Sequence, residues 1–474
     1  MTLIKSISGI RGTIGGPVGE NLTPIDAVKF ASAYGVWLKQ QRQKDNYKVV
    51  VGRDARISGK MIQNLVMNTL VGLGIDVVDV GLSTTPTVEV AVPLEQADGG
   101  IILTASHNPK QWNALKLLNN KGEFLDAVEG AKILDIAESD SMSFADVDSL
   151  GKITKNKAYI DLHIIEVLDL DLVNVKAIEE ERFKVVVDGV NSTGGIAIPL
   201  LLERLGVDVV KLYCEPNGHF PHNPEPLKEH LTDISELVVK EHLTDLSEAV
   251  KKHNADFGIV VDPDVDRLAF VDENGDMFGE EYTLVACADY VLSRTPGNTV
   301  SNMSSTRALR DVTEKHGGMY EASAVGEVNV VNLMKKNKVV IGGEGNGGII
   351  YPDSHYGRDA LVGVALFLSL LADKKMSVSA LRKTYPSYFM GKNKIELTPG
   401  LDVDGILKTM EERYKNEQIT TIDGVKIDFS ESWVHLRKSN TEPIIRIYTE
   451  AKSQEEADSL GDKFIAEIGV IAKS

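Results

Sequence analysis

The sequence predicts an α/β protein with three consecutive blocks of alternating strands and helices, followed by a smaller α+β domain. Short apolar runs alternate with helical periodicity over most of the chain, which is typical of βαβ units and parallel sheets. The 474 residues also exceed what one hydrophobic core organises, because a domain usually holds about 150 residues. We therefore expect four domains, at 1–155, 156–276, 277–384 and 385–474.

The predicted elements repeat a similar order in each block. The first block has strands at 48–51, 77–80 and 100–104 and a helix at 59–73. The second has strands at 184–187, 207–212 and 257–261 and a helix at 195–205. The third has strands at 299–303 and 339–341, a helix at 306–316 and an apolar helix after Arg358. The last domain has strands at 394–397, 425–429 and 444–448, a helix at 403–414 and a final helix.

Charge and composition exclude several classes of protein. With 51 basic against 69 acidic residues the formal net charge is −18, which argues against nucleic acid or an anionic membrane as the partner. The two cysteines make neither a disulfide framework nor a cysteine metal cluster. The longest apolar stretch, 360–372, is too short for a membrane helix of ~20 residues, and the N-terminus lacks a signal-peptide core. We expect a cytoplasmic monomer or homodimer that binds a small molecule.

One segment repeats itself. Residues 228–239 are followed directly by a near copy at 240–251, and both have helical apolar spacing. At about 3.6 residues per turn, the apolar face of the second copy is rotated by roughly 120° from that of the first. One straight helix therefore cannot bury both faces against one surface. We interpret the repeat as an insertion that lengthens or bends a peripheral helix, and an interaction surface is the alternative.

The first candidate site is Thr104-Ala-Ser106-His107-Asn108-Pro109, at the end of a predicted strand. Ligands of open α/β sheets gather at the carboxyl ends of strands, so the Ser106 hydroxyl is well placed for chemistry. Asn-Pro is also an ordinary turn signal, and a structural turn is the alternative. The serine lacks a G-x-S-x-G elbow, which argues against an α/β-hydrolase.

The second candidate site holds three aspartates, Asp262, Asp264 and Asp266, followed by Arg267. Alternate residues of an extended segment point the same way, so the carboxylates converge and repel one another unless a cation binds. Oxygen ligands of this kind select Mg²⁺ or Ca²⁺. An EF-hand is excluded because Arg267 stands where its glycine is required and a strand continues at 268–271. An acidic surface loop is the alternative.

The third candidate site is the glycine-rich loop 342–348, which contains Glu344 and Asn346. Glycines allow close backbone approach, and these two side chains suit neighbouring sugar hydroxyls. The loop has neither the ending of a P-loop nor the spacing of a dinucleotide-binding loop, so a structural turn is the alternative.

The fourth candidate site lies between Arg437 and Arg446, which flank a Ser-Asn-Thr turn. Two guanidinium groups and hydroxyl donors suit a phosphate dianion. Salt screens the distant net negative charge within about 8 Å, so these local donors can dominate. A solvated charged turn is the alternative.

In this order, and over essentially the whole chain, the four loops resemble those of the α-D-phosphohexomutase superfamily. The resemblance implies three similar mixed α/β domains and a smaller C-terminal α+β domain around a central cleft. It also implies transfer of a phosphoryl group between the 1 and 6 positions of a hexose phosphate. Phosphoserine, Mg²⁺ and a hexose 1,6-bisphosphate would take part in that reaction.

The resemblance assigns roles to individual residues. Ser106 is the phosphorylated serine, and Asp262, Asp264 and Asp266 hold Mg²⁺ together with a phosphoserine oxygen, with Arg267 beside them. Lys116 is the expected proton shuttle, which requires a pKa depressed by neighbouring cations. The other implied site residues are Arg11 and His107 near the serine, Glu344 and Asn346 for the sugar, and Arg437, Ser439, Asn440, Thr441 and Arg446 for the phosphate that is not transferred.

The sugar loop departs from the common family form, Gly-Glu-x-Ser-Gly-His. Asn346 replaces the serine and Gly348 replaces the histidine, so His355 or Arg358 is expected to compensate. This variant resembles the archaeal-type phosphoglucosamine mutases, which implies conversion of glucosamine 6-phosphate to glucosamine 1-phosphate. Phosphoglucomutase or phosphomannomutase activity is the alternative.

Two other classes stay open from the residues alone. Asp262-x-Asp264 after a strand is also the nucleophile motif of Mg²⁺-dependent aspartyl phosphatases. That class usually carries Thr or Val where Asp266 stands, and it would leave the Ser106 loop unexplained. A non-catalytic sugar-phosphate sensor would bind the ligand without isomerising it.

Overall fold

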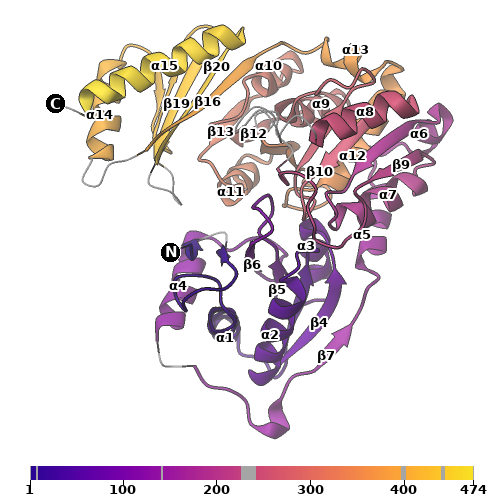
Figure 1. Ribbon diagram of the computed structural model, residues 1–474, viewed down its shortest axis with the longest axis vertical. Coiled ribbons are helices and arrows are strands. Elements are labelled where there is room, and N and C mark those ends of the chain that lie inside the picture. Colours follow the sequence, from indigo (N-terminus) through magenta and orange to yellow (C-terminus); the bar gives the residue numbers. More distant parts are fainter. Residues whose placement is uncertain are drawn as a thin grey trace. The chain divides into compact units, whose positions relative to one another are not determined.

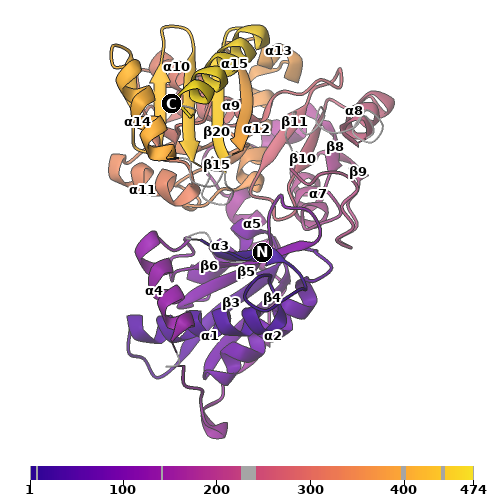
Figure 2. The same ribbon diagram turned by 60° about the vertical axis from the view of Figure 1, so that its left-hand side comes forward.

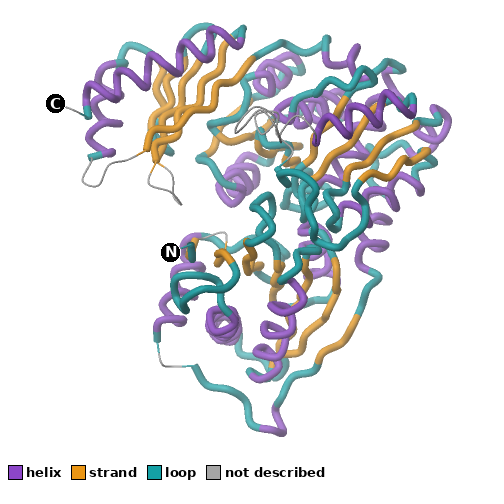
Figure 3. Tube along the Cα trace, in the orientation of Figure 1, coloured by secondary structure: helices purple, strands orange, loops and turns teal. Residues whose placement is uncertain are grey.

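The computed structural model describes residues 2–6, 9–139, 142–225, 242–396, 402–438 and 444–472. Helices and strands are interspersed along the chain, and several pairs of consecutive strands, such as β5 and β6, join without a helix between them (Figure 1, Figure 3). The chain forms two compact units. Unit 1 comprises Met1–Tyr290 and Asn346–Leu381, and unit 2 comprises Val291–Gly345 and Arg382–Ser474. The bounds of the four predicted domains and the central cleft stay predictions.

The first sheet of unit 1 has the order β1-β2-β6-β5-β3-β4-β7. Its middle strands β3, β4 and β5 are parallel, and β6 returns antiparallel to β5. The strands are β1 (Ile4–Ser6), β2 (Gly9–Thr13), β3 (Tyr47–Arg53), β4 (Ile75–Leu82), β5 (Gly99–Leu103), β6 (Trp112–Leu118) and β7 (Ile153–Lys155), and the helices are α1 (Pro24–Gln41), α2 (Gly59–Gly72), α3 (Thr85–Leu94) and α4 (Ala127–Glu138), with a short 3₁₀ turn at Val147–Ser149.

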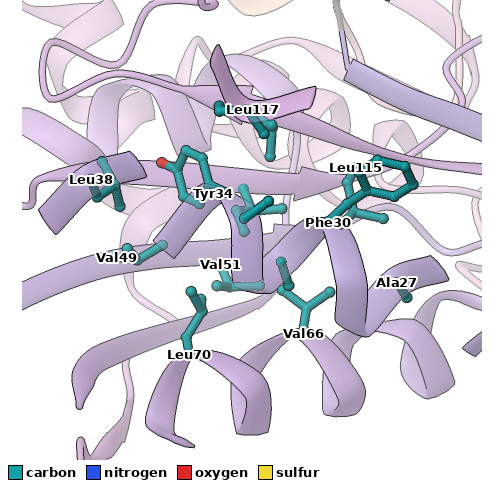
Figure 4. Packing of buried hydrophobic residues seen from close by; sticks show 14 of the residues in the cluster. Ala27, Phe30, Tyr34, Leu38, Val49, Val51, Val66, Leu70, Leu115 and Leu117 are labelled. Atoms are coloured by element: carbon teal, nitrogen blue, oxygen red, sulfur yellow. The ribbon is translucent and has the colours of Figure 1, made fainter. Parts of the chain in front are cut away.

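Both faces of this sheet are buried, because successive strand residues point to opposite sides. Val49 and Val51 pack with Tyr34 of α1 and Leu70 of α2 in one core (Figure 4). Val50 packs into a second core against α3. This burial on both faces explains the continuous apolar run of β3. The packing also fixes the positions at which β3 and β5 end.

The second sheet of unit 1 has the order β11-β10-β8-β9, with β10 parallel to β8 and antiparallel to β11. Within the same unit, Phe367 of α12 stacks on Phe270 of β11 with ring centroids 3.8 Å apart. Residues 360–372 of α12 are all buried, which confirms the predicted core helix. The remaining elements of unit 1 are α5 (Tyr159–Leu168), α6 (Val175–Glu181), β8 (Lys184–Asp188), α7 (Gly194–Arg204), β9 (Asp208–Leu212), α8 (His242–His253), β10 (Phe257–Val261), β11 (Leu268–Val271), β15 (Gly348–Ile350), α12 (Ala360–Lys374) and α13 (Val378–Arg382), of which β15 is not a strand of this sheet.

In unit 2, β12 is parallel to both β13 and β14. The helix α9 (Glu280–Arg294) leads from unit 1 into this sheet. The elements are β12 (Thr299–Asn302), α10 (Ala308–Lys315), β13 (Tyr320–Ser323), α11 (Glu327–Asn337) and β14 (Ile341–Glu344).

The last sheet of unit 2 is antiparallel throughout, in the order β16-β20-β19-β18-β17. Helices α14 and α15 pack into one core on the same face of this sheet (Figure 2). That core takes alternate strand residues, such as Leu436 and Ile445, so their neighbours face the other side. The elements are β16 (Phe389–Glu396), α14 (Val403–Arg413), β17 (Gln418–Thr420), β18 (Val425–Asp428), β19 (Trp433–Lys438), β20 (Ile444–Ala451) and α15 (Gln454–Ile471).

These sheets confirm the predicted fold class of three mixed α/β domains and a C-terminal α+β domain. Of the repeated segment 228–251, the structure describes only the part within α8, where Leu246 and Val250 are buried. The first copy of the repeat lies outside the described residues. In the described part of the chain, every helix is too short or too polar to cross a lipid bilayer.

Candidate active site

Two loops of unit 1, from two different sheets, meet at Ser106. The serine follows β5, and its hydroxyl donates to Asp262 Oδ2, directly after β10, at 2.6 Å. Ser106 is buried and has a φ of 48°, a left-handed conformation that is uncommon for a serine. Its amide donates to Thr104 Oγ1 at 3.0 Å. The structure therefore brings together the first two candidate sites, which are far apart in the sequence.

The three aspartates form a buried cluster. Asp262, Asp264 and Asp266 are fully buried, and each offers a carboxylate oxygen within 4.8 Å of the others. The amides of Asp266 and Arg267 both donate to Asp262 Oδ1 at 3.1 Å, which folds the loop, and Val265 takes a φ of 65°. This tight turn explains how three carboxylates on one short segment come to face one point.

The cluster has the donor set that a divalent cation needs. Among the described residues, nothing hydrogen-bonds to Asp264 Oδ1 or Asp266 Oδ1, although both atoms are buried. Burial, followed by the charges of Asp266 and Asp264, holds the pKa of Asp262 well above its ordinary value. Buried carboxylate oxygens without partners are costly, and a cation such as Mg²⁺ would relieve that cost. These residues therefore fit the implied metal.

Lys116 of β6 lies against the same carboxylates. Its Nζ donates to Asp264 Oδ2 at 2.7 Å and to Asp266 Oδ2 at 3.3 Å. Burial alone would lower the pKa of Lys116, but Asp264 and Asp266 outweigh burial and raise it above the ordinary value. The expectation of a depressed lysine pKa is therefore wrong for this arrangement, because carboxylates and not cations are its nearest neighbours.

Arg11 and His107 lie at the serine loop. Arg11 of β2 donates to Asn108 Oδ1 at 3.4 Å. His107 Nδ1 is 3.4 Å from Ser106 Oγ, and burial together with the charge of Arg267 lowers the His107 pKa to about 3. Both effects favour the neutral imidazole of His107.

Several residues at this site had no motif to reveal them. Thr85 Oγ1 donates to Asp264 Oδ2 at 2.5 Å, and Glu225 accepts from Arg267 Nη1 at 2.5 Å. Arg358 Nη2 donates to Asp266 Oδ2 at 2.8 Å. Of these three residues, the sequence pointed only to Arg358. It did so for a different role, which was to compensate for the histidine that Gly348 replaces.

His355, the other residue expected to compensate, is engaged by two carboxylates of unit 1. Its Nε2 lies 3.1 Å from Asp359 Oδ2, and its Nδ1 lies 3.3 Å from Glu89 Oε2. Asp359 Oδ2 also lies 2.8 Å from His163 Nε2. Burial alone would lower the pKa of His355, but Asp359 and Glu89 raise it to about 10. Both ring nitrogens of His355 are thus paired with carboxylates of the protein.

The two residues of the sugar loop fall in different units, because the division passes between Gly345 and Asn346. In unit 2, Glu344 lies at the end of β14, where its Oε1 accepts from Asn302 Nδ2 at 2.8 Å and from the Gly326 amide at 3.2 Å. In unit 1, Asn346 Oδ1 accepts from the Gly348 amide at 3.3 Å. Each side chain is therefore held in place within its own unit.

Arg437 of β19 and Arg446 of β20 are direct cross-strand partners in unit 2. They lie opposite each other on the face of the sheet that α14 and α15 leave uncovered. Like charges placed directly opposite destabilise a sheet, and a bound anion relieves this repulsion. Arg437 Nε has no hydrogen-bond partner among the described residues. Ser439, Asn440 and Thr441 lie outside the described residues.

Comparison with known proteins gives a consistent result over the whole chain. Models of the phosphoglucomutase/phosphomannomutase family match α/β/α domain I at residues 3–143, domain II at 158–275, domain III at 279–388 and the C-terminal domain at 394–467. A phosphoglucomutase/phosphomannomutase of Thermococcus kodakarensis is 36% identical, with 97% of each chain covered. A probable phosphoglucosamine mutase of Pyrococcus horikoshii is 34% identical, over 96% of this chain and 95% of that protein.

Solved structures agree with these relatives. A family protein of Burkholderia thailandensis is 25% identical and superposes with a TM-score of 0.82 over 98% of each chain. A phosphomannomutase-like protein of Thermus thermophilus, 23% identical over the full length of both chains, gives 0.81 and supports the fold. The chain therefore belongs to the phosphoglucomutase/phosphomannomutase family and is an enzyme of the α-D-phosphohexomutase superfamily.

Proposed function

We propose that this phosphohexomutase interconverts glucosamine 6-phosphate and glucosamine 1-phosphate through a phosphoserine at Ser106 and a hexose 1,6-bisphosphate. The contact of Ser106 Oγ with Asp262 Oδ2 carries the proposal. A hydroxyl at a buried carboxylate cluster that fits a cation is suited to carry a phosphoryl group. The names of the relatives from Pyrococcus horikoshii and Methanopyrus kandleri, both probable phosphoglucosamine mutases, support the choice of sugar.

Asp262, Asp264 and Asp266 are the residues that would hold Mg²⁺. When bound, the ion supplies positive charge to the oxygens of a transferring phosphoryl group. The protein adds Arg11 and Arg267, whose guanidinium groups also stabilise negative charge on that group. The bond of the Arg267 amide to Asp262 Oδ1 holds Arg267 in place, and Asn108 holds Arg11, before the substrate arrives.

The bond changes balance over two half-reactions. In the first, the bond between phosphorus and Ser106 Oγ breaks, phosphorus bonds to the free sugar hydroxyl oxygen, and that hydroxyl loses its proton. In the second, the bond between the other phosphorus and its sugar oxygen breaks, that phosphorus bonds to Ser106 Oγ, and the proton of Oγ passes to the sugar oxygen. The net change moves the phosphoryl group between the two ends of the sugar and restores the phosphoserine.

We assign the transfer of the proton to Lys116. Because it is held charged by Asp264 and Asp266, it first acts as an acid towards Ser106 Oγ, which gains negative charge as phosphorus leaves. It then recovers a proton from the attacking hydroxyl. A charged lysine suits this order because bond breaking runs ahead of bond making in a loose transition state. The neutral His107, 3.4 Å from Ser106 Oγ, assists as a hydrogen-bonding partner.

Sugar and phosphate recognition fall to other residues. The carboxylate of Glu344 suits the ammonium group of glucosamine better than it suits a hydroxyl, and Asn346 suits a sugar hydroxyl. Arg437 and Arg446, with the turn between them, bind the phosphate that is not transferred. The same pair must accept either end of the sugar, because the bisphosphate turns over between half-reactions.

The test is Mg²⁺-dependent turnover of glucosamine 6-phosphate, glucose 1-phosphate and mannose 1-phosphate, each with a trace of the matching 1,6-bisphosphate. We expect glucosamine 6-phosphate to give a kcat/KM at least tenfold higher, about 1.4 kcal/mol of transition-state preference. Mass spectrometry of the wild-type protein should find phosphate on Ser106. Ser106→Ala should keep the fold and lose turnover, whereas Ser377→Ala, at an exposed position, should match the wild type.

The outcomes separate the alternatives. Higher kcat/KM for glucose or mannose phosphate would give this chain the activity in the name of the Thermococcus kodakarensis relative. Phosphate trapped on Asp262 would point to a phosphatase, and binding without turnover to a sensor. Glu344→Gln should reduce kcat/KM more for glucosamine phosphate than for glucose phosphate, while Glu321→Gln, exposed on β13, should change neither.

A further inference from the structure

Arg56 is a fully buried arginine in the loop between β3 and α2, outside every motif that predicted the site. Its Nη1 donates to the carbonyls of Pro109, at 2.8 Å, and Trp112, at 3.2 Å. Its Nη2 donates to the carbonyls of Ser106 and Asn108. A guanidinium group has five N–H donors, and here four of them serve the backbone of the serine loop.

The fifth donor connects Arg56 to a buried carboxylate. Arg56 Nε donates to Asp54 Oδ2 at 2.9 Å, and the Arg56 amide donates to Asp54 Oδ1 at the same distance. Thr104 Oγ1 also donates to Asp54 Oδ2, at 2.7 Å, and accepts from the Ser106 amide. These contacts close a ring that holds Ser106 at both its amide and its carbonyl.

This ring of hydrogen bonds constrains Ser106, which has an unfavourable backbone conformation. Ser106 has a φ of 48°, a conformation that persists in a non-glycine residue only when its surroundings enforce it. Fixing both peptide groups of Ser106 fixes the direction of its Oγ towards Asp262. Within the described part of the chain, every hydrogen bond found for the Arg56 side chain goes to Asp54 or to the serine loop.

The loop between β3 and α2, which contains Arg56, is also linked to the aspartate loop. The amide of Ala55 donates to Ser192 Oγ at 3.3 Å, and Ser192 Oγ donates to the Pro263 carbonyl at 2.7 Å. The Phe220 ring lies over the Arg56 guanidinium, 5.0 Å away. Arg56 therefore stands where the supports of the serine loop and of the aspartate loop join.

We propose that Arg56, oriented by Asp54, is a positioning residue that holds Ser106 in its left-handed conformation and aims its oxygen at the aspartate cluster for phosphoryl transfer. This inference rests on the proposed function. A lysine cannot replace Arg56. Its ammonium group is a single point charge, whereas the planar guanidinium group of arginine donates to several carbonyls at once in fixed directions. The loss should fall on the chemical step, because a small misplacement of a reacting oxygen costs about 100-fold in rate.

The experiment compares Arg56→Lys with Arg53→Lys, the same substitution three positions away. Arg53 bonds to Gln63 and to the Asp54 carbonyl and leaves the serine loop untouched. For Arg56→Lys we expect kcat to fall about 100-fold or more with KM within about threefold, because the defect arises in the transition state. Hydrogen exchange of the amides at 105–108 should accelerate, while exchange in α1 stays as in the wild type. Arg53→Lys should match the wild type in all three measurements.

Two results would overturn the inference: a kcat within about threefold of the wild type for Arg56→Lys, or loss of exchange protection spread equally through unit 1, which marks a purely structural residue. If Arg56→Lys does not fold, Asp54→Asn keeps the arginine and weakens the carboxylate that anchors both Arg56 and Thr104, and it should show the same split between kcat and KM. If the wild type forms no phosphoserine, the proposed function fails, and the exchange measurement still decides whether Arg56 holds the loop.

Discussion

Lys116 Nζ lies 2.7 Å from Asp264 Oδ2, and both side chains are buried. Asp266, which the same ammonium group contacts, also accepts from Arg358. A third cation, Arg267, has its Nε 3.9 Å from Asp266 Oδ1. A divalent ion held by the three carboxylates would add positive charge there and make the site attractive to a phosphate group.

Replacing Lys116 by methionine is expected to destabilise the metal-free protein. Its removal leaves buried carboxylates without their cation, which costs about 3–5 kcal/mol of the free energy of unfolding. Urea denaturation in EDTA measures this loss, and Mg²⁺ should recover part of it. Lys121→Met, at an exposed position after β6, should be as stable as the wild type in both buffers. Equal stability of Lys116→Met and the wild type in EDTA would contradict the account.

Much of the fold and part of the site could be predicted because their signals are local. The aspartate loop is one contiguous motif, and the strand before it has the apolar run that double burial requires. Thr85 could not be found this way, because it lies 179 positions from Asp264 and meets it only through packing. The pKa of Lys116 was mispredicted for the same reason. The sequence shows which charges exist, and the fold decides which of them become neighbours.

Metal binding should stabilise the wild-type protein. Because two buried aspartate oxygens have no hydrogen-bond partner among the described residues, Mg²⁺ is expected to raise the Tm. A free concentration of 100 times Kd would add about 2.7 kcal/mol. Asp264→Asn should abolish the shift measured by scanning calorimetry, and Asp245→Asn on α8, which weakens a contact with Tyr213, should retain it. A shift that survives in Asp264→Asn would place the ion elsewhere.

His355 makes stability depend on pH. Its pKa of about 10 in the folded protein lies above the value of about 6.5 expected when unfolded, because Asp359 and Glu89 outweigh the effect of burial. The stabilisation from protonated His355 is therefore complete below about pH 6.5 and is lost as the pH rises to about 10. The difference in unfolding free energy between the wild type and His355→Gln should shrink by at least about 1 kcal/mol between pH 6 and pH 10.

The control for this dependence is His219→Gln, at an exposed position. Its difference from the wild type should stay constant across the same range. A constant difference for His355→Gln as well would show that the imidazole is not held charged between Asp359 and Glu89. Urea titrations at pH 6, 8 and 10 suffice to decide between these results.

Arg437→Met tests the phosphate grip in unit 2. A charged hydrogen bond contributes about 1.5–3 kcal/mol, so KM for the hexose phosphate should rise about 10- to 150-fold. The kcat should change little, because a group that binds the phosphate that is not transferred acts equally on the ground and transition states. Steady-state kinetics with the preferred hexose phosphate measures both constants.

Lys438→Met separates a specific grip from general attraction. Lys438 is exposed, carries the same charge and follows Arg437 on β19, so it points to the opposite face of the sheet. If KM rises only in Arg437→Met, the guanidinium binds the phosphate through its fixed donors. Equal rises in both variants, reduced by added salt, would mean that the strand pair attracts the substrate only through its net charge. Phosphate binding would then not explain why Arg437 and Arg446, which repel each other, lie directly opposite on neighbouring strands.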